Sequence, residues 1–315
     1  MQRLILELAF LVVAPAAVSF GQVVEERNHS GSAEVVQVGS CHPTVAPEVA
    51  RAALGYFNRA VSKSEKGDDD GAIKDYSSAL RQDPCLALAY HNRGNALRLR
   101  GKLTEAMADF NRAIAINPSL AEAYNNRGLV RRQQADLEGA VADYAKAIEL
   151  RPRYAAAYNN RGNVHQDRHD LAAAISDFGT AVALDPQFAL AYSNRGQARQ
   201  AKGDMRGALD DYNQAIALDP TLYRAYNNRG SLRFALKDPG GAEADFERAI
   251  ELKPGYAIAY LNRGLMQLAQ GRAREAESDF SRCLKFDPSL ASSVPKLSDA
   301  ALRRLNAGTE SNETR

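Results

Sequence analysis

The sequence predicts an all-α fold, an α-solenoid made of seven copies of a pair of helices. A Tyr-x-Asn-Arg block, followed by Gly in six copies, returns every 34 residues. Between the blocks, small and aromatic residues recur at helical spacing, and a Pro stands at one fixed place in every copy. A fixed period of this length is typical of repeats that bury their apolar faces only against their neighbours. The blocks open at Tyr56, Tyr90, Tyr124, Tyr158, Tyr192, Tyr226 and Tyr260.

Length and charge indicate one elongated domain that does not bind nucleic acid as its main partner. The repeats run from residue 53 to residue 290 of 315 and leave only short flanks. The chain has 40 Lys and Arg against 38 Asp and Glu, and the two signs alternate along the helices. Nucleic-acid binding proteins instead gather basic side chains into patches. We therefore expect no nucleic-acid partner.

The first residues resemble an export signal. Arg3 precedes an apolar run over residues 4–20, and small residues follow at a possible cleavage site. A single membrane anchor is the alternative, but the run is shorter than the ~20 apolar residues that span a bilayer, and it contains Glu7. We expect a signal peptide over 1–21, no stable membrane span, and a periplasmic or secreted protein. Residues 22–45 are polar and predict a flexible linker.

Within each repeat, the fixed residues predict how its two helices, A and B, meet. We number each repeat from 1 to 34 so that its Tyr is position 4. Position 8 is Gly except for Ala60, position 20 is always Ala, and position 24 is always Tyr or Phe. Small residues let the two helices approach, and the aromatic ring fills the space beside them. Gly-Asp between the helices favours a C-cap and then an N-cap, and Pro at position 32 ends helix B.

This set of positions closely resembles the tetratricopeptide repeat. The resemblance covers about three quarters of the chain and implies an α-α superhelix whose A helices line a concave groove. Solenoids need an end piece over the last apolar face, and Val294, Leu297 and Ala301 match positions of a further helix A. We therefore predict a solenoid over 46–305 with a C-terminal capping helix over 291–305 and a disordered tail over 306–315. The predicted repeats are 53–86, 87–120, 121–154, 155–188, 189–222, 223–256 and 257–290.

Position 7 departs from the family pattern, because it is Arg where the family usually has Leu. This position lies on the packing stripe of helix A, so each Arg needs a partner. Helix B offers an Asp at position 23 in every repeat. We predict a ladder of partly buried Arg-Asp pairs that fixes how the repeats stack. The pairs join Arg59 to Asp75, Arg93 to Asp109, Arg127 to Asp143, Arg161 to Asp177, Arg195 to Asp211, Arg229 to Asp245, and Arg263 to Asp279.

Positions 2, 5, 6, 9, 12 and 13 share the other face of helix A, which in the family lines the groove. Position 6 is Asn in all repeats, and carboxamides can bind an extended peptide backbone whatever its side chains. The alternative is that these amides cap or cross-link neighbouring helices. The predicted groove residues are Asn58, Asn92, Asn126, Asn160, Asn194, Asn228, Asn262, His91, Asn95, Arg98, Arg132 and Asn163.

The last repeat changes the character of this face. It presents Leu261, Leu265 and Leu268 at groove positions. These leucines predict either an apolar anchor site for the ligand or a contact with the C-terminal cap.

The sequence predicts no catalytic residue, metal or cofactor. It lacks a Gly-x-Ser-x-Gly elbow and a Gly-rich phosphate loop. His165 and His169 have i, i+4 spacing, but no third ligand can be named, so we expect a surface pair. Of the three cysteines, Cys283 occupies a buried Ala position, whereas Cys41 and Cys85 could form a bond that staples the N-terminal end if the chain is exported.

These observations predict a non-enzymatic interaction scaffold. Its partner would be a protein or peptide whose extended segment, polar or acidic in character, lies in the concave groove. The alternative is a structural or assembly protein of the cell envelope that acts through its convex face or its ends.

Overall fold

The computed structural model describes residues 46–296, 298 and 299, and it is helical throughout those residues. The predicted signal peptide, linker and C-terminal tail lie outside the described residues, as does most of the predicted cap over 291–305. Contacts divide the chain into two units, which among the described residues comprise 46–184 and 185–299 without 297. Repeats one to four form the first unit, and repeats five to seven with the C-terminal segment form the second.

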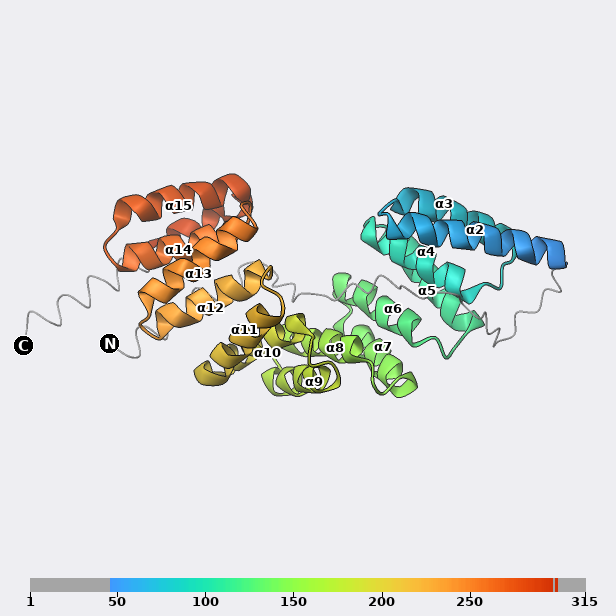
Figure 1. The fold of residues 1–315 in the computed structure, drawn as a ribbon, viewed down its shortest axis with the longest axis horizontal. Helices are drawn as coiled ribbons and strands as arrows, with labels where there is room; N and C mark the ends of the chain where they lie inside the picture. The colour runs from blue at the N-terminus through green and yellow to red at the C-terminus, as the bar shows by residue number, and fades with distance from the viewer. Residues whose placement is uncertain (1–45, 297, 300–315) are drawn as a thin grey trace, which may run out of the picture. The chain divides into compact units, whose positions relative to one another are not determined.

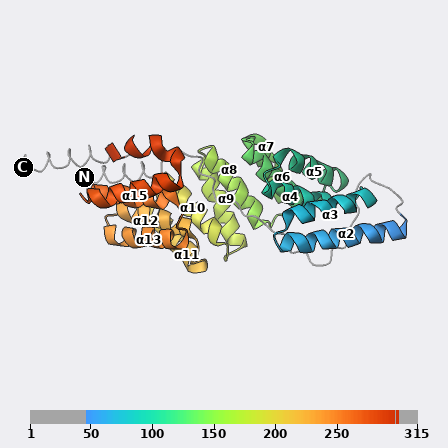
Figure 2. The same cartoon turned by 90° about the horizontal axis from the view of Figure 1, so that it is seen from above.

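Each repeat is a pair of antiparallel helices, as predicted (Figure 1). The A helices are α2 (Pro47–Glu65), α4 (Ala87–Leu99), α6 (Ala121–Gln133), α8 (Ala155–Asp167), α10 (Ala189–Lys202), α12 (Tyr223–Ala235) and α14 (Ala257–Ala269). The B helices are α3 (Asp69–Gln82), α5 (Leu103–Ile116), α7 (Leu137–Leu150), α9 (Leu171–Leu184), α11 (Met205–Leu218), α13 (Pro239–Leu252) and α15 (Ala273–Phe286). The side-by-side packing of α2 with α3 is visible in both views (Figures 1 and 2), and that of α14 with α15 is visible in Figure 1.

The crossing of the two helices follows the predicted small-residue rule. A Cβ added to Gly162 on α8 would lie 2.8 Å from Cε1 of Phe178 on α9. Such a distance is shorter than a van der Waals contact, so any larger residue would push the helices apart. Ala174 at position 20 is fully buried beside this crossing. The same close approach recurs at Gly128 against Tyr144.

Turns and caps set the direction of the chain between helices. The Asp136 and Asp204 side chains accept hydrogen bonds from the first turns of α7 and α11, as expected for N-caps. Position 15, at the end of helix A, has a left-handed backbone conformation in every repeat, and it is Gly in four of them. Ala135, His169 and Lys237 adopt the same conformation, with φ of 62°, 60° and 66°.

The C-terminal segment covers the last repeat. After α15, a 3-10 helix, η1 (Pro288–Ser292), replaces the first turn of the predicted cap, and a helical segment begins at Val294. Leu261, Leu265 and Leu268 are buried in one cluster with Leu290 and Val294. The contact with the C-terminal segment, one of the two roles predicted for these leucines, is therefore present.

The cysteines differ in state. Cys283 is a free and fully buried thiol in the same cluster, as predicted, and burial raises its pKa to about 11. Cys85 is buried just before α4 and is disulfide-bonded. Cys41 lies outside the described residues, so its bond with Cys85 stays a prediction at this point.

Candidate functional site

All seven predicted Arg-Asp pairs are present. Each guanidinium donates two hydrogen bonds or more to both oxygens of the Asp sixteen residues later, over 2.6 to 3.2 Å. The aspartates are 2 to 6% exposed. Bidentate Arg-carboxylate pairs of this kind fix both distance and orientation. Each pair therefore locks helix A onto helix B within its own repeat.

The link between successive repeats comes from a different nitrogen of the same arginines. Arg127 Nη1 donates to Asn111 Oδ1 on helix B of the preceding repeat at 2.7 Å. Arg93 reaches Ser77 Oγ in the same way at 2.9 Å, and Arg229 reaches Asn213 Oδ1 at 2.8 Å. One guanidinium thus joins its own repeat to the one before it at these three places.

Sequence reasoning missed two partners in this ladder. Each Arg of position 7 also lies over the ring of the Tyr of position 4, with 5.0 to 5.9 Å between Cζ and the ring centroid. A second cation at position 11 approaches the Asp in four repeats, for example Arg131 Nη1 at 3.0 Å from Asp143 Oδ2. The constant i, i+3 spacing of Tyr and Arg was the signal for the first of these contacts.

The fourth repeat has a histidine, His165, at position 11. His165 Nε2 lies 3.7 Å from Asp177 Oδ2, and His169 is exposed in the left-handed turn after α8. The two rings therefore have different surroundings. Among the described residues, no group of three or more His, Cys, Asp or Glu could hold a metal ion.

At two places, the predicted asparagine row takes part in a chain of amides between neighbouring A helices. Asn160 Nδ2 on α8 donates to Asn125 Oδ1 on α6 at 3.1 Å, and Asn125 Nδ2 donates to Asn126 Oδ1 at 3.1 Å. In the second unit, Asn262 Nδ2 donates to Asn227 Oδ1 at 3.0 Å. The cross-linking role that the sequence left open is present at these amides.

Comparison with the amide chains of the other repeats explains why one buried oxygen has no donor. Asn262 Oδ1 is buried and has no hydrogen-bond partner within the described part of the chain. In repeats three, four and six, an Asn at position 5 donates to the Oδ1 atom of the Asn at position 6. Leu261 occupies that position in the last repeat and has no hydrogen to donate.

The predicted groove residues differ in how far solvent reaches them. Asn58 is exposed, and Asn92, Asn95 and Asn228 are half-buried. Their role in binding a ligand stays a prediction. The buried members are His91, Arg98, Asn126, Arg132, Asn160, Asn163, Asn194 and Asn262.

Two of the buried residues are guanidinium groups held on consecutive A helices. Arg98 on α4 donates to Asn95 Oδ1 at 3.0 and 3.3 Å. Arg132, at the same repeat position on α6, donates to both oxygens of Asp167 on α8 at 2.6 and 3.2 Å. His91 lies on the same side of α4 with its ring 5.9 Å from that of Phe110. Burial lowers the pKa of His91 to about 4, so the ring is neutral at pH 7.

Models of the repeat families match the chain over most of its helical part. One, described as TPR repeat, matches residues 64–99, 94–134 and 128–168. Three described as tetratricopeptide repeat match 155–188, 189–222 and 227–291. The chain belongs to the tetratricopeptide repeat family. Members of this family act in protein-protein interaction and are typically not enzymes. No curated protein sequence matches the chain.

Solved structures of tetratricopeptide repeat proteins share this fold. A tetratricopeptide repeat protein of Parabacteroides merdae is 21% identical with a TM-score of 0.63, over 79% of this chain and 99% of its own. A chain of the APC/C hetero-tetramer Cut9-Hcn1 is 18% identical with a TM-score of 0.69, over 77% and 48%. The pilF protein of Pseudomonas aeruginosa is 18% identical with a TM-score of 0.60, over 67% and 96%.

Proposed function

We propose that this tetratricopeptide repeat protein is an exported, non-enzymatic scaffold that holds an extended peptide or protein tail on the face formed by its A helices. The family supports protein partners, since its members act in protein-protein interaction. Among the described residues, no helix has both the length and the apolar character to cross a membrane. Export rests on the sequence of residues 1–21 alone.

The A-helix face is the inner face of each unit. Successive A helices, such as α4 with α6 and α12 with α14, contact each other more closely than successive B helices do. A stack of helix pairs curves toward the side on which its helices lie closer together. A ligand on this side therefore meets several repeats at once, as an extended segment does.

The observation that carries the proposal is the polar character of this inner face in the first unit. Asn92 and Asn95 are half-exposed on α4, and the Arg98 guanidinium on the same helix donates to Asn95 Oδ1. Carboxamides both donate and accept hydrogen bonds, and guanidiniums bind carboxylates. These groups favour an extended segment with polar or acidic side chains. The leucines of the last repeat do not add an apolar anchor, because Leu290 and Val294 pack with them.

Crosslinking in cells, followed by mass spectrometry, tests the inner face. The tagged full-length protein is compared with the variant N92A/N95A, whose folding is checked by thermal melting because Asn92 bonds to Tyr76 and Asn95 accepts from Arg98. The matched control is K74A/R112A, which removes two exposed side chains of the B helices α3 and α5. We expect partners that are lost in N92A/N95A and kept in K74A/R112A. The opposite pattern would move the function to the outer face or the ends.

Export has its own test, the mass of the protein purified from its native compartment. A mature chain that begins near residue 22 is expected. An intact chain that stays in the cytoplasm would contradict export and leave the binding face untouched.

A further inference from the structure

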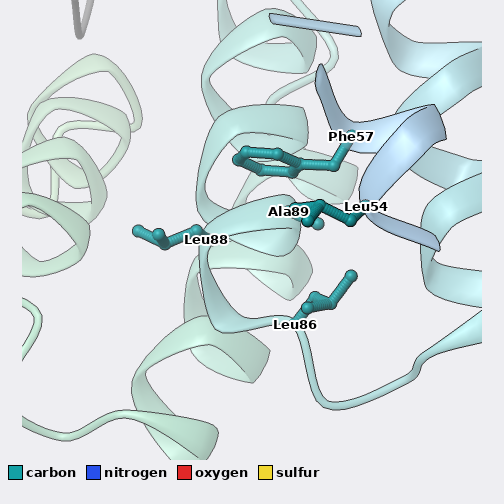
Figure 3. A pocket seen from close by; sticks show the side chains of 5 residues that line it. All are labelled: Leu54, Phe57, Leu86, Leu88 and Ala89. Carbon is teal, nitrogen blue, oxygen red and sulfur yellow. The ribbon is translucent and has the colours of Figure 1, made fainter. Parts of the chain in front are cut away.

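An apolar pocket lies at the N-terminal end of the first unit. Leu54 and Phe57 of α2 line it together with Leu86, Leu88 and Ala89 around the start of α4 (Figure 3). The space between these side chains is small and is lined by apolar atoms. It is too small for a typical small-molecule ligand, so it suits apolar side chains.

The pocket is open because α2 is the first A helix. Within each unit, a later A helix lies against the repeat before it, as α4 lies against α2 and α3, whereas no described helix precedes α2. Leu54 is 41% exposed, one of three large apolar side chains of the described residues with that much exposure. The terminal face of a solenoid needs a covering segment to keep such side chains from water.

The disulfide at Cys85 indicates which segment of the chain covers the pocket. Cys85 immediately precedes Leu86 of the pocket and is disulfide-bonded. The chain has three cysteines, and Cys283 is a free thiol. We propose that Cys41 is the partner of Cys85, and that this bond holds residues 35–38 of the same chain, with their three valines, over the pocket.

The length of the chain allows this arrangement. Val36 and Val38 lie five and three residues before Cys41, so an extended backbone of ~3.3–3.6 Å per residue puts Val38 about 10 Å from the bond. The pocket begins one residue after Cys85. Val36 and Val38 also fall on the same side of an extended chain and can face the leucines together. After Cys41, the chain needs only to reach Pro47, where α2 begins.

Forming the bond requires an oxidant. The Cys41 and Cys85 thiols lose two protons and two electrons as the sulfur-sulfur bond forms. The disulfide of a thiol-disulfide oxidoreductase accepts both electrons and protons and becomes a dithiol. Such oxidants act in the compartments to which exported proteins are sent.

Counting thiols tests the pairing. The full-length protein, unfolded in urea without a reductant, is expected to have one reactive thiol, from Cys283, and three after reduction. The C283S variant is expected to have none before reduction. Two or more reactive thiols in the unreduced wild-type protein, or a disulfide-linked dimer, would overturn the proposed bond.

Tryptophan fluorescence tests the docking, since the chain has no tryptophan of its own. We expect V36W or V38W to emit at shorter wavelength than free tryptophan and to resist acrylamide quenching. Adding L54D to either variant, or reducing the disulfide, is expected to return the emission to that of exposed tryptophan. L236D is the matched control, because Leu236 is also exposed, at 47%, but lies after α12.

Two results would overturn the docking. Emission typical of exposed tryptophan in both variants would show that residues 35–38 do not cover the pocket, and buried emission that survives L54D would place them elsewhere. A dimer in sedimentation that L54D dissolves would assign the pocket to a second copy of the chain instead.

Discussion

Arg127 shows how much one side chain does in this fold. Its guanidinium binds both oxygens of Asp143, reaches Asn111 of the preceding repeat and lies 5.4 Å from the ring centroid of Tyr124. Asp143 also forms an ion pair with Arg131, and it is 2% exposed. Two cations thus depend on one buried carboxylate.

We expect Asp143→Ala to lower the free energy of unfolding by about 3 kcal/mol, because it strands charges that are partly buried. Glu149→Ala on the same helix is the control. Glu149 pairs with Lys146 at the surface, and such pairs contribute ~0–1 kcal/mol. Urea unfolding measures both, and equal losses in the two variants would show that the ladder is not structural.

His91 makes stability depend on pH. Burial holds its pKa at about 4, whereas an unfolded His titrates near ~6.5. Between these values the unfolded chain binds more protons, so stability falls as the pH falls, by up to about 3 kcal/mol. His91→Asn supplies the residue of position 5 in repeats three, four and six. We expect it to lose less stability between pH 7 and pH 4.5 than wild type does. Equal losses in urea unfolding would argue against a buried neutral ring.

Two buried tyrosines of position 24 differ in the hydrogen bonding of their hydroxyls. The Tyr212 hydroxyl donates to Gln200 Oε1 at 2.9 Å, whereas the buried Tyr144 hydroxyl has no hydrogen-bond partner among the described residues. We expect Tyr212→Phe to cost ~1–3 kcal/mol, because it leaves the buried Gln200 oxygen unpaired, and Tyr144→Phe to be neutral or stabilising. Thermal melting of the two variants checks this order, and a reversed order would contradict it.

At the scale of the helix pair, glycine has opposite effects at two places. Gly162→Ala would put a methyl group 2.8 Å from Phe178, and we expect a cost of ~1–3 kcal/mol. Gly55 lies inside α2 with no atom within 4 Å of an added Cβ, so Gly55→Ala should stabilise by ~0.5–1 kcal/mol through helix propensity. Chemical unfolding measures both. If both variants were destabilised, helix propensity would not explain Gly55.

The sequence was sufficient to predict the helix pair of each repeat. Gly at position 8 and Ala at position 20 predict where helices A and B cross, and Pro at position 32 predicts where helix B ends. These predictions were possible because the effects of the three residues are steric and local. The Arg-Asp pairs were predictable because a charge on a packing stripe requires a partner. Left-handed turns at Ala135, His169 and Lys237 follow only from their register with the four glycines of position 15, since an Ala or a Lys does not itself favour that conformation.

The groove residues show where sequence reasoning ends. An Asn at position 6 has the same spacing whether it binds a ligand or a neighbouring helix. The distance between the A helices decides whether its side chain bonds to the neighbouring helix. In the structure, Asn160 Nδ2 lies 3.1 Å from Asn125 Oδ1. Leu261 and its neighbours were equally ambiguous until η1 and Val294 were seen to pack with them.

At the scale of the whole molecule, the stacked pairs serve as a frame. Buried Arg-Asp pairs and amide chains hold the helices, and the half-exposed amides of α4 are the groups that we propose for recognition on the inner face. If the proposed binding on this face is right, we expect recognition of backbone and charge more than of particular side chains. Affinity for a disordered tail is expected to be modest, because ordering the tail costs free energy.

Site-specific photo-crosslinking in cells tests the inner face most directly. A photoreactive phenylalanine replaces Asn95 on the inner face of α4 or, in a second variant, the exposed Arg112 of α5. We expect protein adducts at position 95, through an extended polar or acidic segment of the partner, and none at position 112. Adducts at position 112 alone would contradict binding on the inner face.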